Sequence, residues 1–365
     1  MSSSEQWSAG KLRKSLLIDE RTKQPMNDEP AEAKTNRQQS RWLIYAAFAA
    51  VYLIWGSTYL GIKYAIESLP PFLMAGTRFL VAGAALYAWA WVRGERSGAA
   101  EHPRRALWRT AFIVGGLLLL CGNGGVTWAE RSIPSGLAAL LVATEPLWIV
   151  LLNWARPGGV RPGFRVLLGL LVGFAGVWLL IGKGISGGEV DLFGAALVIG
   201  AAFAWAAGSI YSLRAPVHSS PLLASGMQML AGGALLMFTS LLAGEWTSFD
   251  LSKVSAVSAG ALLYLIVFGS IIAFTAYSWL LRVTTPARAA TYAYVNPVVA
   301  VLLGWAMASE ALSWRMLTGA GVIVAAVALI TSYGKHHEPE AKATKRKGPA
   351  NSRANAVICQ SQRSL

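Results

Sequence analysis

SGLAALLVATEPLWIVLLNW, residues 135–154, is an apolar run that carries a carboxylate and a proline at its centre, Glu145 and Pro146. About 150 residues later the pattern returns, in a second apolar run that carries Asn296 and Pro297 at the matching depth. A proline within a helix lacks an N–H and displaces the carbonyl four residues back, so each run predicts a bent helix. Bent backbone in a membrane is tolerated where it is buried in protein or lines a water-filled cavity. Both bends therefore predict a cavity.

The composition indicates a protein embedded in a membrane. Of the 365 residues, 55% are hydrophobic and 14% are charged, and the mean hydropathy is +0.47, whereas soluble domains average about 25% charged residues. The net charge of +14 does not indicate nucleic-acid binding, because the basic residues are spread through the gaps between apolar runs and form no single stripe. The two cysteines, Cys121 and Cys359, lie in an apolar run and a polar tail, so we expect neither a disulfide framework nor a metal site.

Ten apolar runs of about 20 residues, the length that crosses a bilayer as a helix, follow one another along the chain. They lie near residues 42–65, 71–92, 108–129, 134–154, 164–182, 191–213, 221–243, 257–281, 286–308 and 314–334. The predicted fold class is therefore an all-α membrane protein with ten transmembrane helices. We expect a polar, disordered N-terminal tail at residues 1–41 and a basic, disordered C-terminal tail at residues 335–365.

The two halves of the chain resemble each other at an offset of 150 or 151 residues. The matched positions include Trp55 with Trp205, Pro71 with Pro221, Trp128 with Trp279, and Pro146 with Pro297. We therefore predict one repeat at residues 42–183 and a second at residues 191–334. Each holds five helices, an odd number, so the second repeat should enter the membrane from the opposite side. Such inverted repeats place substrate near the bilayer midplane, between the halves.

Lysine and arginine near the helix ends are divided unevenly between the two sides of the predicted bundle. One side holds only Lys63, Arg131, Lys183, Lys253 and Arg315, whereas the two termini and the remaining gaps hold many more. Because cytoplasmic loops carry the excess of positive charge, both termini are predicted in the cytoplasm.

Three motifs connect the chain to a known family. They are Ile54-Trp55-Gly56-Ser57-Thr58-Tyr59, the stretch from Pro71-Phe72 to Arg78-Phe79, and Thr144-Glu145-Pro146-Leu147-Trp148. They resemble the EamA family of the drug/metabolite transporter superfamily, and its bacterial inner-membrane members most of all. The resemblance covers about residues 45–333. It implies a ten-helix bundle around a central cavity and transport without ATP hydrolysis, often export. The simplest drug exporters of the superfamily carry a carboxylate in the first helix, and this chain has none there.

Glu145 is the first candidate site residue. A charge at the bilayer centre costs at least about 2.5–3.5 kcal/mol, so its side chain should face the interior of the bundle. It could take up a proton during transport, or hold a cationic group of the substrate. The alternative is a structural role, in an ion pair with Arg78 or a hydrogen bond to Asn123.

Three further polar residues lie inside apolar runs. Arg78 could grip a substrate carboxylate in bidentate fashion, or could extend to the headgroups or cap a helix; its repeat mate, Gln228, is neutral. Asn123 lies among glycines, and either lines the cavity or joins two helices. Asn296, beside a predicted bend, is expected to line the cavity.

Aromatic and hydroxyl side chains in repeat-related helices form the last group of candidates. They are Trp55, Ser57 and Tyr59 in the first run, Trp205 in the sixth, and Tyr294 in the ninth. A broad aromatic surface suits tolerant binding. Ordinary packing, or anchoring at the membrane interface, is the alternative for each of them.

The predicted function is secondary transport of a small metabolite, amino acid or drug across the bacterial inner membrane by alternating access, in the direction of export. No HExxH, P-loop or G-x-S-x-G motif occurs in the chain, so we expect no enzyme activity and no cofactor. The expected partners are a small-molecule substrate and the lipid bilayer, without nucleic acid, in a monomer or a homodimer. The alternatives are a membrane-embedded enzyme acting on a lipid-linked substrate, and a scaffold or receptor that acts through its tails.

Overall fold

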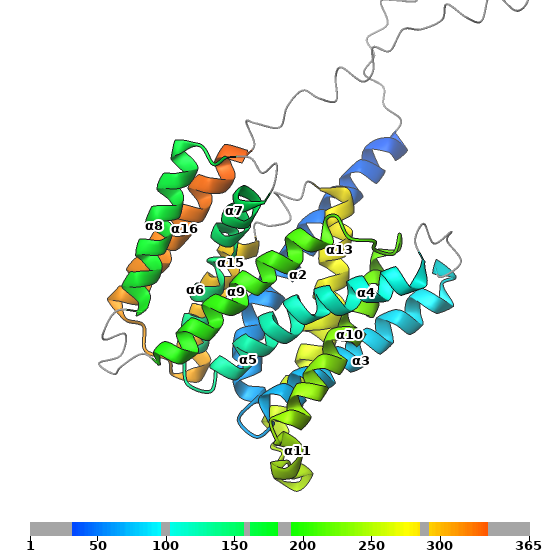
Figure 1. Ribbon diagram of the computed structural model, residues 1–365. Helices are drawn as coiled ribbons and strands as arrows, with labels where there is room; N and C mark the ends of the chain where they lie inside the picture. The colour runs from blue at the N-terminus through cyan, green and yellow to red at the C-terminus, as the bar shows by residue number, and fades with distance from the viewer. Residues whose placement is uncertain (1–30, 96–102, 157–160, 182–190, 285–291, 335–365) are drawn as a thin grey trace, which may run out of the picture. The chain divides into compact units, whose positions relative to one another are not determined.

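The computed structural model describes residues 31–95, 103–156, 161–181, 191–284 and 292–334, and every regular element in these ranges is a helix (Figure 1). The part of the chain from Phe48 onward forms one compact unit, which holds every candidate site residue. The first half contains α2 (Ala31–Ala65), α3 (Pro71–Val92), α4 (Arg104–Gly115), η2 (Gly116–Gly124), α5 (Gly125–Ala129), α6 (Ser135–Val142), α7 (Glu145–Ala155) and α8 (Phe164–Ile181). The second contains α9 (Leu192–Ser212), α10 (Pro221–Leu242), α11 (Glu245–Ser248), η3 (Leu251–Lys253), α12 (Ala256–Tyr264), η4 (Leu265–Ile272), α13 (Ala273–Val283), α15 (Tyr292–Ala308) and α16 (Trp314–Gly334).

Each of the ten predicted apolar runs contains helical structure. Seven helical stretches in the described ranges are long and apolar enough to cross a membrane, namely Trp42–Ala65, Pro71–Val92, Arg104–Ala129, Ser135–Ala155, Leu192–Ser212, Pro221–Leu242 and Ala256–Tyr277. Shorter apolar helices, Val166–Gly176, Val295–Ala308 and Met316–Ala326, lie in the other three runs. The predicted all-α membrane class is therefore confirmed for the described residues. The first helix differs from the prediction because α2 begins at Ala31, inside the expected tail.

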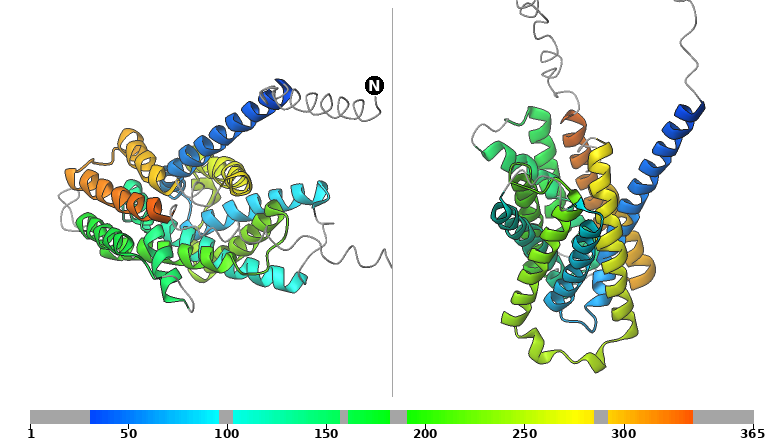
Figure 2. Two further views of the ribbon diagram at one scale, coloured as in Figure 1. Left: turned by 90° about the horizontal axis from the view of Figure 1, so that it is seen from above. Right: turned by 90° about the vertical axis from the view of Figure 1, so that its right-hand side faces the viewer.

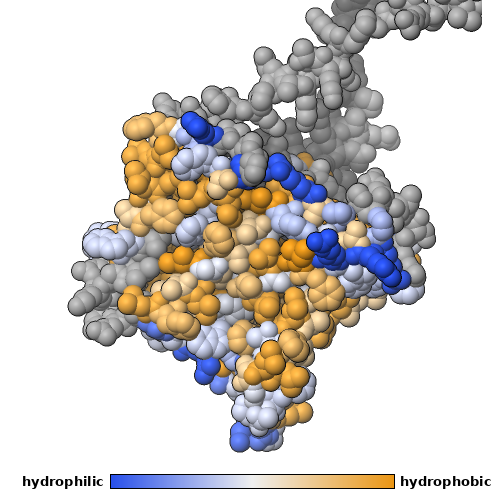
Figure 3. Space-filling view, viewed as in Figure 1, coloured by the Kyte–Doolittle hydropathy of each residue, from blue (hydrophilic) through white to orange (hydrophobic). Residues whose placement is uncertain are grey.

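The outer surface of the unit is apolar, as a bilayer requires. Large apolar side chains such as Phe164, Trp178 and Trp314 are more than three-quarters exposed. Figure 3 shows apolar residues over much of the described surface on the visible face. Contiguous apolar surface of this extent is rare on soluble monomers and marks a membrane or protein contact.

α3 and α10 pack against each other in opposite directions. Glu245, just after α10, accepts hydrogen bonds from the backbone N–H groups of Phe72 (3.1 Å) and Leu73 (2.8 Å) at the start of α3. Glu95, just after α3, accepts a hydrogen bond from Ser220, which is the N-cap of α10. An acid that follows each helix thus contacts the start of the other: Glu245 caps α3 directly, and Glu95 binds the hydroxyl of the residue that caps α10. The connection through α11 to α12 lies at one end of the unit (Figure 2).

Two glycines make the closest contacts between these helices in a reciprocal way. A Cβ on Gly83 would lie 2.8 Å from the backbone nitrogen of Leu230, and a Cβ on Gly233 would lie 2.8 Å from that of Leu80. Both distances are too short for a real Cβ. Gly83 and Gly233 are 150 residues apart in sequence, as are Leu80 and Leu230. Equivalent residues of the two halves therefore make the same glycine–leucine contact, once in each direction.

Two of the predicted runs contain π-helical segments at related positions. η2 interrupts the run between α4 and α5, and η4 interrupts the run between α12 and α13. Their starts, Gly116 and Leu265, are 149 residues apart. π-Helical turns are rare, and they occur frequently at functional sites.

The fourth run breaks where a bend was predicted. α6 ends at Val142 and α7 begins at Glu145, with a turn at Ala143 and Thr144 between them. Pro146 therefore lies in the first turn of α7, where a missing N–H is not needed. The prediction of one continuous bent helix is wrong here, because a second helix starts before the proline. In the ninth run Pro297 does lie inside one helix, α15.

Candidate functional site

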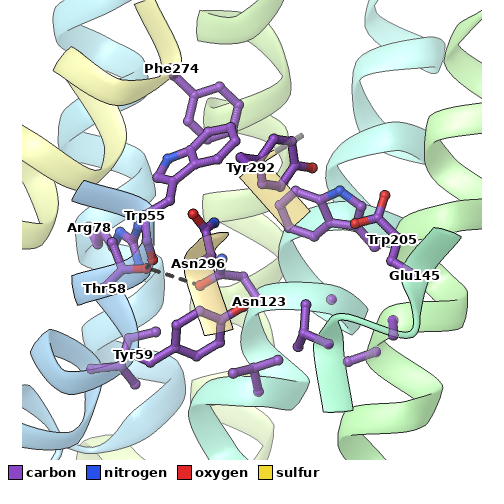
Figure 4. A pocket seen from close by; sticks show the side chains of 16 residues that line it. Trp55, Thr58, Tyr59, Arg78, Asn123, Glu145, Trp205, Phe274, Tyr292 and Asn296 are labelled. Atoms are coloured by element: carbon purple, nitrogen blue, oxygen red, sulfur yellow. Dashed lines mark hydrogen bonds between the residues drawn. The ribbon is translucent and has the colours of Figure 1, made fainter. Parts of the chain in front are cut away.

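A cavity of about 90 Å³ lies between the helices of the two halves (Figure 4). About 10–15 Å³ of such volume holds one water molecule, so the cavity can hold several. Its lining residues are Trp55, Thr58, Tyr59 and Ile62 of α2, Arg78 of α3, Gly122 and Asn123 of η2, Val126 of α5, Val142 of α6, Glu145 of α7, Ala201, Ala202 and Trp205 of α9, Phe274 of α13, and Tyr292 and Asn296 of α15. Seven of the predicted site residues, Glu145, Asn296, Arg78, Asn123, Trp55, Tyr59 and Trp205, are thus brought together at one cavity.

Arg78 is held at one side of the cavity by groups from both π-helical segments. Its Nε donates to Ser270 Oγ of η4 at 2.9 Å, and its Nη1 approaches Asn123 Oδ1 of η2 at 3.4 Å. The guanidinium carbon also lies 4.8 Å from the centre of the Phe79 ring. The side chain is 3% exposed, so it points into the bundle and does not extend to the headgroups.

Glu145 lies on the other side of the cavity in Figure 4, at the first position of α7. It is 8% exposed. Both Glu145 and Arg78 are described, and no ion pair within 4.0 Å joins them; nor does a hydrogen bond join Glu145 to Asn123. Neither structural alternative considered for this acid is formed. The free N–H groups of a helix start favour a negative charge there, so the break before α7 gives the carboxylate a suitable position.

An aromatic group surrounds Trp55. Its ring centre lies 5.5 Å from that of Phe274, 5.1 Å from Tyr277 and 5.0 Å from Tyr292, which is the range of favourable aromatic contacts. The indole N–H of Trp55 donates to the carbonyl of Gly269 in η4 at 3.1 Å. This hydrogen bond fixes the ring against the π-helical segment that also holds Arg78.

Asn296 and Trp205 complete the walls. The side-chain amide of Asn296 lies 3.2 Å from the carbonyl oxygens of Tyr292 and Tyr52, and donates to both when its nitrogen faces them. Trp205 packs directly on Gly122, where a Cβ would lie 2.9 Å from the indole ring. A glycine in η2 is therefore required for this tryptophan to lie at the cavity.

Three predicted site residues are not placed at this cavity. Ser57 Oγ donates to Ile54 O at 2.8 Å and lies 2.5 Å from Tyr264 Oη, away from the cavity lining. Gln228 lines a separate small cavity beside α4, so the repeat mate of Arg78 does not share its site. The side chain of Tyr294 lies outside the described residues.

Sequence reasoning missed several lining residues, and helix periodicity could have found some of them. Tyr292 precedes Asn296 by four residues and Ile62 follows Tyr59 by three, so each pair shares one helix face. Phe274 carried no such signal, because it lies in a run that is apolar on every face.

A polar cluster at the end of the bundle was also missed. Glu310, which follows α15, accepts hydrogen bonds from Lys63 Nζ (2.7 Å), Ser135 N (2.8 Å), Ser135 Oγ (2.8 Å) and Gly136 N (3.1 Å). It thereby joins α2 to the start of α6. Burial raises the pKa of Glu310, but these hydrogen bonds outweigh burial and hold its pKa below the usual range. Within the described ranges, no three His, Cys, Asp or Glu side chains gather as a metal site.

Comparison with known proteins gives one family. The sequence pattern of the EamA-like transporter family matches twice, at residues 40–182 and 192–332. The uncharacterized inner membrane transporter YedA of Escherichia coli strain K12 is 42% identical over 297 residues, which cover 81% of this chain and 92% of YedA. A probable amino-acid metabolite efflux pump of Salmonella typhimurium strain LT2 is 26% identical over 285 residues, or 75% of this chain and 90% of that protein.

A solved crystal structure has the same fold, with a TM-score of 0.55 and 22% sequence identity over 80% of this chain and 98% of that one. The two matches to the family pattern together cover well over half of the sequence. The chain therefore belongs to the EamA-like transporter family.

Proposed function

We propose that this protein is a secondary transporter that exports a small metabolite, amino acid or drug across the bacterial inner membrane by alternating access. The observation that carries the proposal is the cavity, because its walls come from α2, α3, η2, α5, α6 and α7 of the first family match and α9, α13 and α15 of the second. A site between two halves becomes accessible from either side when the halves move against each other.

We also propose that the two matches are five-helix repeats of opposite orientation, at residues 42–183 and 191–334, in a ten-helix bundle. The contacts of Glu245 with the start of α3 and of Glu95 with the N-cap of α10, and the doubled glycine contact between the two helices, support this arrangement, because equivalent helices of an inverted repeat run antiparallel. The paired π-helical segments support it as well. Two similar halves give two similar ways of closing the cavity, one toward each side.

The walls favour an amphipathic substrate with charged groups. Arg78 offers a guanidinium to a carboxylate, Glu145 offers a carboxylate to an ammonium group, and the rings around Trp55 offer an apolar surface. A zwitterionic amino acid or a similar metabolite combines these features. The name of the Salmonella relative, a probable amino-acid metabolite efflux pump, agrees with this class.

The orientation follows from charge. The end with Lys63 and Lys253 is poor in basic residues, whereas the opposite end and both termini are rich in them, so we place both termini in the cytoplasm. We assign no enzyme activity, because a carboxylate needs a second acid–base group nearby and Arg78 and Asn123 are poor partners. A scaffold acting through its tails would depend on residues 1–38 and 340–365, and deleting them would leave transport unchanged.

The test begins with metabolite profiles of cells and medium, with and without the protein, to choose candidate substrates. Counterflow of these compounds is then measured in proteoliposomes. Ala202→Phe, which fills the cavity, should abolish counterflow, whereas Gly200→Phe on the same helix should leave it intact, because a Cβ there meets no atom within 4 Å. Conversion of a candidate to a new product, or equal flux through both variants, would contradict the proposal.

A further inference from the structure

Glu130, the residue after α5, is a buried acid whose oxygens have no hydrogen-bond partner. It is 5% exposed, and neither Oε1 nor Oε2 contacts a donor among the described residues. Its backbone N–H donates to Val126 O at 3.0 Å and continues the hydrogen-bond pattern of the helix before it. An ionised carboxylate buried here would lose its hydrogen bonds to water and gain none from the protein. The carboxylate therefore needs a bound cation or proton, because no described side chain around it donates a hydrogen bond.

The charged and titratable groups that face Glu130 come from three elements. Lys63 and Tyr59 lie on α2, Arg78 lies on α3, and Glu310 follows α15. Burial raises the pKa of Glu130 well above its usual range; Glu310 raises it further, and Lys63 and Arg78 act in the opposite direction. The protonated, neutral form is therefore the form that this position favours.

Lys63 and Glu310 form the connection next to this acid, which we call the Lys63–Glu310 clasp. The 2.7 Å ion pair joins α2 of the first family match to the end of α15 in the second. Tyr64 Oη donates to Met307 O at 2.6 Å beside it. The side chain of Glu310 is 7% exposed and that of Lys63 is 30% exposed, so the pair is partly shielded from water. The clasp holds the two halves together at this end of the cavity.

We propose that Glu130 is a proton-binding site that controls the Lys63–Glu310 clasp, and thereby the opening of the cavity toward the outer side of the membrane. This proposal rests on the transport function and orientation given above. With the proton on Glu130, Lys63 has one carboxylate partner and the clasp is closed. When the O–H bond of Glu130 breaks and the proton passes to water, the remaining carboxylate competes for Lys63 and repels Glu310. The clasp then opens.

Tyr59 connects this site with the transport cavity. It lines the cavity, and its hydroxyl lies within electrostatic range of both Glu130 and Glu145. It also packs against the apolar cluster that contains Val126 and Ala129, immediately before Glu130. Substrate or proton bound at Glu145 is thus one side chain away from the acid that controls the clasp.

The experiment measures access to the cavity and needs no substrate. Ala202→Cys, in a Cys121→Ser/Cys359→Ser background, is labelled in right-side-out vesicles with a membrane-impermeant thiol reagent between pH 5 and pH 9. Each rate is divided by the rate for the unfolded protein at the same pH. We expect the normalised rate to rise about tenfold with pH as Glu130 loses its proton. Glu130→Gln, which mimics the protonated form, should keep the low rate throughout.

Two further variants make the result specific. Lys63→Met lacks the clasp and should label at the high rate at every pH, whereas Glu67→Gln, which changes an exposed acid in the turn just after α2, should follow the unchanged protein. A pH-dependent rise that survives in Glu130→Gln overturns the proposal, and so does a closed cavity in Lys63→Met. Glu130→Gln must also fold, because it replaces one neutral group by another; a variant that does not fold contradicts a protonated Glu130.

The labelling profile separates this proposal from the proposed function. A protein that carries no substrate would still show the pH-dependent access, and a working transporter without this access would fail the labelling test alone.

Discussion

The two proline segments of the cavity wall have the same sequence pattern and different structures. In the first half the helix ends before Glu145-Pro146 and restarts there, and in the second half α15 continues through Asn296-Pro297. At the break, Thr144 Oγ1 donates to Leu141 O at 2.7 Å and takes up a helical carbonyl. In α15, the Asn296 side chain lies 3.2 Å from Tyr292 O, one turn earlier in the same helix. A polar side chain beside each proline bonds a helical carbonyl, but only in the first half does a new helix start there.

Because of this difference, the polar side chain beside the proline is, within the described part of the chain, free in the first half and hydrogen-bonded to backbone in the second. The break leaves Glu145 without a partner among the described residues, at a helix start that favours negative charge. In the continuous helix, the amide of Asn296 faces two backbone carbonyls, Tyr292 O of its own helix and Tyr52 O of α2. The first segment is therefore suited to binding a ligand, and the second to maintaining the wall.

The largest effect is expected from Glu145→Gln, which makes the two segments chemically alike. Removing the negative charge removes the site for an ammonium group or a proton, so flux in proteoliposomes should fall by at least about a thousandfold, or about 4 kcal/mol. Thermal unfolding should change little, because no described ion pair depends on this carboxylate.

Glu67→Gln is the control for this measurement, since it removes an exposed acid from the turn after α2. Flux that is unchanged in Glu145→Gln and follows the same pH dependence as in the unchanged protein would remove Glu145 from the mechanism.

The next effect concerns Glu310, which follows the continuous helix α15 and caps α6, before the break. Glu310→Gln replaces charge-assisted hydrogen bonds by neutral ones, so the free energy of unfolding should fall by about 1.5–3 kcal/mol at neutral pH. Because the pKa of Glu310 is lowered in the folded protein, its stabilisation is present above the unfolded pKa of about 4.3. It is lost as pH falls through the folded pKa.

Thermal unfolding in detergent between pH 3 and pH 7 tests this expectation. The unchanged protein and Glu310→Gln should converge at the acid end. Asp250→Asn removes an exposed acid with a lowered pKa and should have a smaller effect. A difference between the proteins that stays constant with pH would show that the charge of Glu310 is not the cause.

A smaller loss is expected from Asn296→Leu. Two backbone carbonyls lose a donor, those of Tyr292 and Tyr52, and a net hydrogen bond contributes about 0.5–1.5 kcal/mol. The unfolding temperature should fall, and flux by the folded fraction should remain. If Asn296→Leu abolished flux without changing stability, the amide would act on the ligand and the division between the segments would be wrong.

The positions of these residues were partly readable from the sequence. Glu145, Arg78, Asn123 and Asn296 could be placed at a cavity because a polar group within an apolar run must face protein or water. Ser57 does not line the cavity, and its hydroxyl donates to a carbonyl of its own helix. A small hydroxyl can bond locally in this way on any face, so its type does not set its direction.

Other features depend on contacts that no single stretch contains. Glu130 stands at the end of an apolar run, where a charge indicates a solvated loop, yet it is buried and lies within electrostatic range of Lys63, Arg78 and Glu310, which are far away in sequence. At the break before Glu145, both the hydroxyl and the backbone N–H of Thr144 donate to Leu141 O. The pattern TEP predicted a polar group beside a distorted helix, and it did not distinguish a bend from a restart.

The smallest effects are expected from replacing the prolines themselves. Pro146→Ala should lower the free energy of unfolding, whereas Pro297→Ala should leave it equal or slightly higher. Pro146 lies in the first turn of α7, where its fixed φ is favourable and its missing N–H is not needed. Pro146→Ala should therefore lower the free energy of unfolding by about 0.4–1 kcal/mol, through the greater freedom of the unfolded chain.

Pro297→Ala gives the unfolded chain the same extra freedom, but it also restores a helical N–H within α15, and one such hydrogen bond contributes about 0.5–1.5 kcal/mol. The second variant should match or slightly exceed the unchanged protein in thermal unfolding. Equal losses in both would mean that Pro297, like Pro146, stands at a helix start, and the contrast between a broken and a continuous wall helix would fail.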